Sequence, residues 1–202
     1  MTSVSSVSDR RLLVATLNRA KSRELAELLA DPRFDVVALA DLPGAPLPDE
    51  TGTTYAENAL IKARAAWRTT GMRTIADDSG LEVDALGGAP GIYSARYGGA
   101  GLDDAGRVAR LLDELHDVPD ERRTARFRCV IALITPAGRE RVVEGTVEGL
   151  IARAPRGAGG FGYDPVFVYP PLGRTFAELT REEKSRVDHR GAAVRALARV
   201  LA

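Results

Sequence analysis

The sequence predicts an α/β protein, because strand patterns and helix patterns follow one another along its 202 residues. An apolar run at 11–16 precedes a helix pattern that ends before Pro32, and a second helix pattern covers about 54–70. Alternating apolar residues at 125–134 return through 141–147 as a long hairpin. With 45% hydrophobic residues, the chain has an ample core for one domain or two packed lobes.

Composition excludes several classes of protein. Basic and acidic residues both number 28, so the formal net charge is zero, and we expect no binding to a nucleic-acid polymer or to a membrane. A single cysteine excludes an internal disulfide and, with two histidines, a Cys/His zinc site. Residues 1–9 are Ser-rich and lack the features of a signal peptide. We expect a cytoplasmic protein with a flexible tail at 1–9.

The first strand and helix patterns are joined by a short polar turn at 16–18. A strand, a tight turn and a helix present backbone N–H groups and the positive end of a helix dipole to an anion, with Lys21 one turn into the helix. The glycines and the Lys-Ser/Thr pair of a P-loop are missing. Both a phosphate cradle and an ordinary β-turn-α unit capped by Asn18 are compatible with this pattern.

The second helix begins with the capping-box pattern of Thr54–Glu57 and has Gly71 as its stop signal. One turn further on, Asn58 and Lys62 are four residues apart, so they share a face that offers an amide and an ammonium to one ligand. Before the helix, Asp49 and Glu50 are candidate metal ligands. A solvated turn explains this acidic pair equally well.

An adjacent acid pair, Asp77 and Asp78, follows a short apolar run and precedes a segment rich in glycine. Two carboxylates at the end of a predicted strand repel each other unless a cation lies beside them, and Mg²⁺ accepts oxygen ligands of this kind. The pair therefore predicts a phosphate ester that arrives with its metal. A solvated Asp-Asp-Ser-Gly turn is the alternative.

The lysines favour the phosphate interpretation. Of the 28 basic residues only Lys21, Lys62 and Lys184 are lysine, so arginine supplies nearly all other positive charge. A lysine ammonium is a compact charge that suits a phosphate oxygen. Chance survival in an arginine-rich composition is the alternative. We expect all three ammonium groups and Asp78 to share one crevice.

Two later segments carry less chemistry. The helix pattern at 104–115 looks architectural, with apolar residues at helical spacing. Cys129 falls on the alternating apolar set of the hairpin and has no neighbouring histidine in the sequence. We therefore expect it to be a buried core residue rather than a nucleophile.

The glycine-rich segment at 156–165 formally fits G-x-G-x-x-G, but Tyr163-Asp164-Pro165 follows where a dinucleotide-binding fold requires a helix. We reject that fold. The glycines instead predict a mobile loop that lets Phe161 stack on a base, with Asp164 making a polar contact. A glycine-rich hairpin with core aromatics is the alternative.

The end of the chain repeats the capping-box pattern at 180–183, directly before Lys184. A compact polar group, Asp188-His189-Arg190, comes next and leads into a closing helix at about 194–201. His189 either reads the edge of a purine or caps a turn.

Five ordered blocks make the sequence resemble the inosine triphosphate pyrophosphatase family over about 11–201. The blocks are VATLNRAKSREL (14–25), ETGTTYAENALIKARAA (50–66), ADDSGLEVDALGGAPGIYSARY (76–97), GGFGYDPVF (159–167) and ELTREEKSRVDHRGAA (178–193). The resemblance implies a mixed, elongated β-sheet with flanking helices, forming two lobes around a central substrate cleft. It also implies a single domain at 10–202, usually a homodimer. The implied activity hydrolyses dITP, ITP and XTP with Mg²⁺ to the monophosphate and pyrophosphate, which cleanses the nucleotide pool.

The resemblance also implies roles for individual residues. Asp78 is the expected general base and a Mg²⁺ ligand, Lys21 assists catalysis, and Asp49 or Glu50 supplies another ligand. The expected substrate-binding residues are Thr16, Asn18, Lys21, Asn58, Lys62, Ser79, Phe161, Gly162, Tyr163, Asp164, Lys184, His189 and Arg190.

This sequence departs from the family pattern at Leu17, a position that is often smaller or polar, and at Asp188, where serine is usual. The second departure predicts extra negative charge near the base pocket. Two rival functions stay open: a pyrophosphatase that prefers pyrimidine or modified bases, and a nucleotide sensor without turnover.

Overall fold

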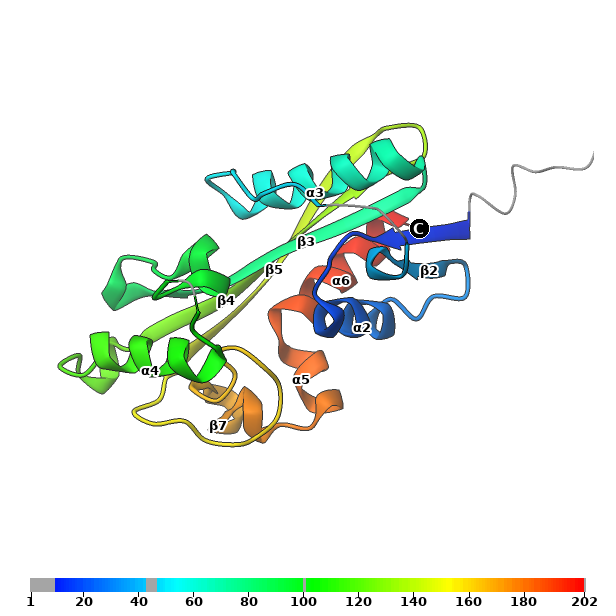
Figure 1. Cartoon of the computed structure of the whole chain (residues 1–202). Helices are drawn as coiled ribbons and strands as arrows, with labels where there is room; N and C mark the ends of the chain where they lie inside the picture. The colour runs from blue at the N-terminus through cyan, green and yellow to red at the C-terminus, as the bar shows by residue number, and fades with distance from the viewer. Residues whose placement is uncertain (1–9, 43–46, 100, 202) are drawn as a thin grey trace, which may run out of the picture. The chain divides into compact units, whose positions relative to one another are not determined.

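Figure 1 shows the chain as a computed structural model that describes residues 10–42, 47–99 and 101–201. The expected tail at 1–9 lies outside these residues. Seven strands form one mixed sheet in the order β2-β1-β3-β4-β5-β6-β7, flanked by helices, which confirms the α/β prediction. Within the described residues, no helix is long and apolar enough to cross a membrane.

The strands are β1 (Arg11–Val14), β2 (Asp35–Ala38), β3 (Arg73–Val83), β4 (Thr124–Ile134), β5 (Glu140–Ile151), β6 (Phe167–Tyr169) and β7 (Arg174–Thr175). The α-helices are α2 (Arg19–Leu28), α3 (Tyr55–Thr70), α4 (Asp104–Glu114), α5 (Arg181–Val187) and α6 (His189–Leu201). β1 pairs in parallel with β2 and β3, and β6 pairs antiparallel with β5 and β7. β4 and β5 are neighbours joined by the turn at 135–139, as the hairpin pattern predicts.

The chain divides into two compact units. The first unit comprises Met1–Asp78, Cys129–Gly145 and Ala193–Ala202, and the second unit comprises Ser79–Arg128 and Thr146–Ala192. Within β3, the chain passes from the first unit to the second between Asp78 and Ser79.

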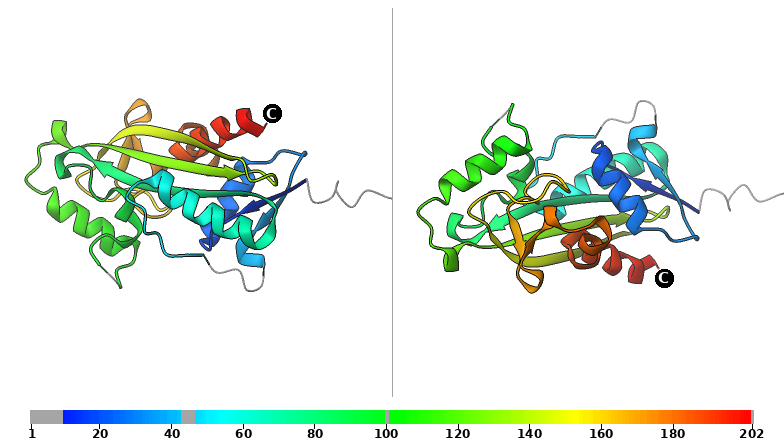
Figure 2. Two further views of the ribbon diagram at one scale, coloured as in Figure 1. Left: turned by 90° about the horizontal axis from the view of Figure 1, so that it is seen from above. Right: turned by 90° about the horizontal axis from the view of Figure 1, so that it is seen from below.

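In the first unit, helices cover both faces of the strands. α2 packs on one face and α3 lies along the other, as Figures 1 and 2 show. The α2 side holds a buried apolar cluster, which includes Cys129 as predicted: Leu12, Val14, Leu25, Leu29, Ile75, Cys129, Ile131, Leu133, Ala193, Val194 and Leu197. On its buried stripe α3 presents Ala59, Ala63 and Ala66, whose small side chains let the helix approach the sheet closely.

The ends of α3 form as the sequence predicts. The Thr54 hydroxyl accepts a hydrogen bond from the Glu57 N–H at 3.1 Å, and the Glu57 carboxylate accepts one from the Thr54 N–H at 3.2 Å. Gly71 ends the helix with φ 66°, a left-handed conformation that favours glycine. These contacts fix where the residues of the first helical turn project.

The second unit has an aromatic core. The Phe127 ring lies 4.6 Å from the Phe167 ring and 6.0 Å from the Phe176 ring, measured between centroids. α4 adds Val108 and Leu111 to this core, which confirms the helix predicted there. Aromatic pairs at these separations contribute beyond the apolar area that they bury.

The expected position of the acid pair at the end of a strand is wrong. β3 continues to Val83, so Asp77 and Asp78 lie in its middle. The strand continues because Leu81 and Val83 are fully buried in the second unit's core. The strands β2, β6 and β7 are short, with two to four residues each, and the sequence pattern did not reveal them.

We expect Leu81→Ala to lower the free energy of unfolding by about 2–5 kcal/mol, because it empties a fully buried site. The control is Leu172→Ala in the same unit, where the side chain is 44% exposed and the loss stays within about 0.5 kcal/mol. Urea unfolding of both variants measures the difference. Equal unfolding midpoints would contradict the assignment of Leu81 to the core.

Candidate functional site

The two neighbouring acids on β3 point to opposite faces of the sheet, since successive side chains of a strand alternate. Their contacts agree with this geometry. Asp77 Oδ2 lies 3.5 Å from Lys21 Nζ on α2, whereas Asp78 Oδ1 lies 3.9 Å from Lys62 Nζ on α3. Asp77 thus contacts Lys21 directly and Asp78 contacts Lys62, and the charge of each acid also acts on the other's lysine.

Asp78 is the centre of a buried polar cluster on the α3 side. Its side chain is 7% exposed, and its Oδ2 accepts a hydrogen bond from Asn58 Nδ2 at 3.1 Å. Lys62, 9% exposed, also donates to Glu50 Oε1 at 2.5 Å. One ammonium thus lies between two carboxylates, Glu50 and Asp78, that approach it from different segments of the chain.

The pKa shifts follow from this arrangement. Burial raises the pKa of Asp78, and the charge of Lys62 opposes the rise without cancelling it. Burial acts to lower the pKa of Lys62, but the charges of Asp77 and Asp78 together with the hydrogen bond and charge of Glu50 outweigh it, and the net shift of that pKa is upward. A carboxylate with a raised pKa accepts a proton more readily, which suits a general base.

The two acids proposed before α3 differ in position. Glu50 is half-buried and pairs with Lys62, whereas Asp49 is exposed. Glu50 is therefore the carboxylate that the fold places beside Asp78, and it also contributes to the raised pKa of Asp78.

The turn before α2 combines a cap with a cationic side chain. Asn18 Oδ1 accepts a hydrogen bond from the Lys21 N–H at 3.1 Å, so Asn18 caps the helix as the sequence allowed. Thr16 Oγ1 accepts one from the Asn18 N–H at 3.2 Å. Beyond the cap, the charge of Lys21 acts to lower the pKa of Asp78. Thr16, Asn18 and Lys21 therefore lie together in the first unit, as predicted.

In the second unit, Lys184 and Asp164 form a buried pair with a distance of 2.6 Å from Nζ to Oδ2. The same carboxylate oxygen accepts the Phe161 N–H at 3.0 Å. Above the Phe161 ring, Lys184 Nζ lies 5.2 Å from the centroid, and the Arg190 guanidinium carbon lies 5.6 Å from it. The predicted aromatic ring is half-buried and flanked by two cations.

The polar group at the start of α6 is buried. The His189 ring stacks on Phe127 at 4.7 Å with an interplanar angle of 11°. Arg190 Nη2 donates to Ser79 Oγ at 3.3 Å, so these two predicted residues meet. Asp188 Oδ1 accepts the Gly191 N–H at 2.7 Å, which is the bond of a helix N-cap. Serine makes the same bond, so the Asp188 departure preserves the cap.

The loop at 160–164 is bound by a residue of α4, a helix for which the sequence predicts only an architectural role. Asp104 Oδ2, on the first turn of α4, accepts the Gly162 N–H at 2.8 Å. No local pattern predicts this bond, because the two residues are 58 positions apart. Tyr163 is 5% exposed and donates its hydroxyl to the Ser94 carbonyl at 3.0 Å, so its ring packs in the core.

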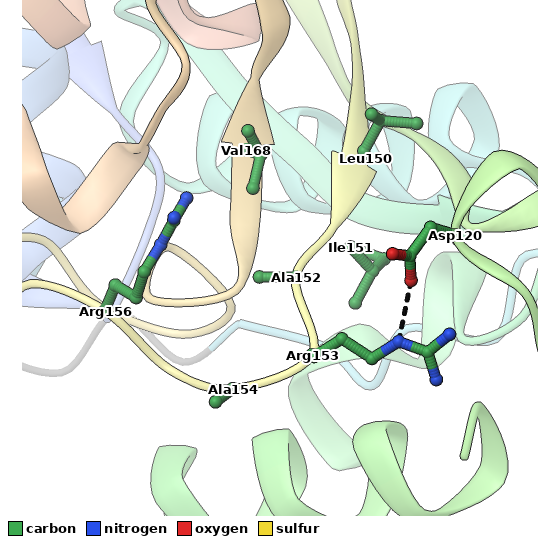
Figure 3. A pocket seen from close by; sticks show the side chains of 8 residues that line it. All are labelled: Asp120, Leu150, Ile151, Ala152, Arg153, Ala154, Arg156 and Val168. Carbon is green, nitrogen blue, oxygen red and sulfur yellow. Dashed lines mark hydrogen bonds and ion pairs between the residues drawn. The ribbon is translucent and has the colours of Figure 1, made fainter.

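An open cavity of about 430 Å³ lies in the second unit (Figure 3). Apolar side chains of β5 and β6 line it, among them Leu150 and Val168, and Arg153 on its rim pairs with Asp120 at 2.6 Å. None of the predicted site residues lines this cavity.

The three lysines are each paired with an acid. The fold brings Lys21 and Lys62 to Asp77 and Asp78 in the first unit, and it brings Lys184 to Asp164 in the second. A crevice common to all three lysines stays a prediction.

We expect Glu183, the third residue of α5, to stabilise the fold in a pH-dependent way. The hydrogen bond from Arg174, at 2.7 Å, and the Thr180 N–H lower the pKa of Glu183 to about 2. Without these contacts its pKa is 4.5. The stabilisation is therefore complete above about pH 5 and is lost as the pH falls towards 2.

The measurement compares urea midpoints of the wild type and Glu183→Gln at pH 7 and pH 3. The wild type is more stable at pH 7, and the difference shrinks at pH 3. The control is Glu182→Gln, whose carboxylate forms only an exposed pair with Arg186 and contributes little at either pH. A difference for Glu183→Gln that grows on acidification would contradict the predicted sign.

Comparison with known proteins identifies the family. The model of the Ham1 family matches residues 12–200. The chain is 53% identical to the dITP/XTP pyrophosphatase of Geobacillus kaustophilus (strain HTA426) over 185 residues, which are 92% of this chain and 91% of that protein. It is 51% identical to the dITP/XTP pyrophosphatase of Escherichia coli (strain K12) over 190 residues, 93% of this chain and 96% of that protein.

Solved structures of similar proteins support the same family. A HAM1 protein from Coxiella burnetii superposes with a TM-score of 0.86 at 43% identity, covering 95% of this chain and 98% of that one. A nucleoside-triphosphatase / dITP/XTP pyrophosphatase from Mycobacterium abscessus superposes with a TM-score of 0.75 at 49% identity, with the same coverage. The chain is therefore a member of the Ham1 family, as the five sequence blocks implied.

Proposed function

We propose that this chain hydrolyses dITP, ITP and XTP to the nucleoside monophosphate and pyrophosphate. The observation that carries the proposal is Asp78, a buried carboxylate with a raised pKa that lies beside Lys62 and Asn58. Relatives at more than 50% identity that bear the name dITP/XTP pyrophosphatase support the choice of substrate.

In the proposed reaction, water attacks the α-phosphorus, a new P–O bond forms, and the bond to the bridging oxygen breaks as pyrophosphate leaves. Asp78 orients the water and accepts its proton. Lys21 and Lys62 balance the negative charge on the phosphate oxygens. The N-terminal end of α2, with Thr16 and Asn18, holds the same phosphates.

A divalent ion fits this proposal as a companion of the substrate. Within the described part of the chain, no three acidic, His or Cys side chains form a group that holds a metal by itself. Mg²⁺ usually takes one or two carboxylates and completes its shell with phosphate oxygens and water. Asp78 and Glu50, which both approach Lys62, are suited to that role, and bound Mg²⁺ would polarise the phosphate.

The second unit supplies groups suited to the base. Phe161 offers a ring on which a base can stack, and Lys184 and Arg190 lie beside that ring. The other residues proposed to surround the base are Ser79, Gly162, Asp164 and His189. Inosine and xanthine present a 6-oxo acceptor, and adenine presents an amino donor. A fixed cationic donor therefore favours the 6-oxo purines and rejects adenine. Tyr163 serves as support beneath the loop.

The setting of the activity is part of the same proposal. We propose that the enzyme is a homodimer and works in the cytoplasm. Its removal of non-canonical triphosphates prevents their incorporation into DNA and RNA. A sensor without turnover is a weaker interpretation, because binding alone needs no buried base such as Asp78.

Asp78→Asn is expected to reduce turnover of dITP by about 10² to 10⁴, because the amide keeps the size but loses the basicity. Pyrophosphate release measures the loss, and circular dichroism checks the fold. The control is Asp117→Asn, at a side chain that is 88% exposed, with unchanged turnover. Near-normal turnover by the folded Asp78 variant would reject its role.

A substrate panel tests the proposed specificity in the wild type. We expect kcat/KM for dITP and XTP to exceed that for dATP by about 10² or more, because the adenine amino group leaves a buried donor unpaired. A second panel of pyrimidine triphosphates tests the rival preference. Equal hydrolysis of dITP and dATP would contradict the proposed recognition of the 6-oxo group.

A further inference from the structure

Asn58 connects two segments of the first unit through its side-chain amide. The residue lies one turn into α3 and is fully buried. Its Oδ1 accepts a hydrogen bond from the Gly52 N–H at 2.8 Å, and its Nδ2 donates to Asp78 Oδ2 at 3.1 Å. One end of the amide thus contacts the loop before α3, and the other contacts β3.

The loop is tightly packed where it contacts Asn58. A Cβ atom on Gly52 would lie 2.7 Å from Asn58 Oδ1 and 2.7 Å from the Glu57 Cβ, so only glycine fits there without a shift. Next to it, the Thr53 N–H donates to the Glu57 carboxylate at 2.7 Å. The loop is therefore fixed on the start of α3. Glu50, two residues before Gly52, extends from this fixed segment to Lys62.

The strand end of the link orients Asp78. With Oδ2 engaged by Asn58, the other oxygen, Oδ1, is the one that lies 3.9 Å from Lys62. Lys62 in turn binds Glu50, so both carboxylates approach the same ammonium. Asn58 and Lys62 are four residues apart on one helical face, which makes α3 the common support of this arrangement.

Only an amide of this length satisfies both ends. An aspartate at position 58 keeps the acceptor for Gly52 but turns a second carboxylate towards Asp78. An alanine leaves the Gly52 N–H and Asp78 Oδ2 without this buried partner, which is costly. The residue type is therefore fixed by the two groups that it joins.

We propose that Asn58 is a positioning residue that holds Glu50 and Asp78 at the separation required for both to bind one divalent ion with the substrate phosphates. The inference rests on the proposed function and deepens it. Asn58 makes these contacts with Gly52 and Asp78, and a contact with the substrate stays a prediction.

The test uses Asn58→Asp and the α,β-imido analogue of dITP, which is not cleaved at the α-phosphorus. Calorimetry measures binding of the analogue by the full chain, once with Mg²⁺ and once with EDTA. We expect the affinity gained from Mg²⁺, taken as the ratio of the affinities with Mg²⁺ and with EDTA, to fall by about 10–100-fold in the variant, because it disturbs groups that orient the ligands. An undiminished Mg²⁺ gain in the folded variant would overturn the proposal.

Gly52→Ala disturbs the same link from the loop side and decides the matter if Asn58→Asp does not fold. It too is expected to reduce the Mg²⁺ gain, and a wild-type gain would count against the proposal. The matched control is Thr74→Val, which removes the 2.8 Å hydrogen bond from the buried Thr74 side chain to the carbonyl of Met72, directly before β3. If this control lost the Mg²⁺ gain as well, general loosening would explain the result and Asn58 would have no special role.

Pyrophosphate release from dITP by the wild type separates the two ideas. If the wild type releases none, the proposed function fails. If the wild type is active and both Asn58→Asp and Gly52→Ala keep the full Mg²⁺ gain, only the role of Asn58 is rejected.

Discussion

The burial of two carboxylates at consecutive positions of one strand is the constraint on which the site depends. Removing an ionised carboxylate from water is costly unless a charge or hydrogen-bond donor compensates it. Because a strand alternates its side chains, Asp77 and Asp78 need compensation on different faces, and α2 and α3 deliver Lys21 and Lys62 to those faces. The placement of both helices in the first unit is thus tied to the chemistry of β3.

The parts of the fold that the sequence predicts are those that depend on residues close together in the chain. The caps of α3 and α5 and the stop at Gly71 involve partners within four residues, and all of them form. The length of β3 depends on burial in a core built from distant segments, and the bond between Asp104 and Gly162 spans 58 positions, so neither leaves a local pattern. Glu50 and Asp49 are equivalent candidate metal ligands in the sequence. Only the tertiary contact of Glu50 with Lys62 distinguishes them.

In the glycine-rich loop at 160–164, the single side chain of Asp164 makes several of the contacts that hold the loop. Asp164 accepts the Phe161 N–H and pairs with Lys184, and it fills the space beside Gly160, where an added Cβ would lie 2.0 Å from its carboxylate. With φ at 72°, Gly160 also adopts a backbone conformation that other residues avoid. The position of the aromatic ring therefore depends on a carboxylate and on the absence of a side chain, two features that stacking alone does not require.

The core of the first unit joins the two ends of the chain. Leu12 and Val14, from the first strand, share their apolar cluster with Val194 and Leu197 of α6, the last helix of the chain. A nascent polypeptide emerges from its N-terminal side, so these early residues wait without their final partners until nearly all of the chain has been synthesised. During translation, the strand β1, which precedes the turn at 16–18, exposes apolar surface, and chaperones are expected to protect it.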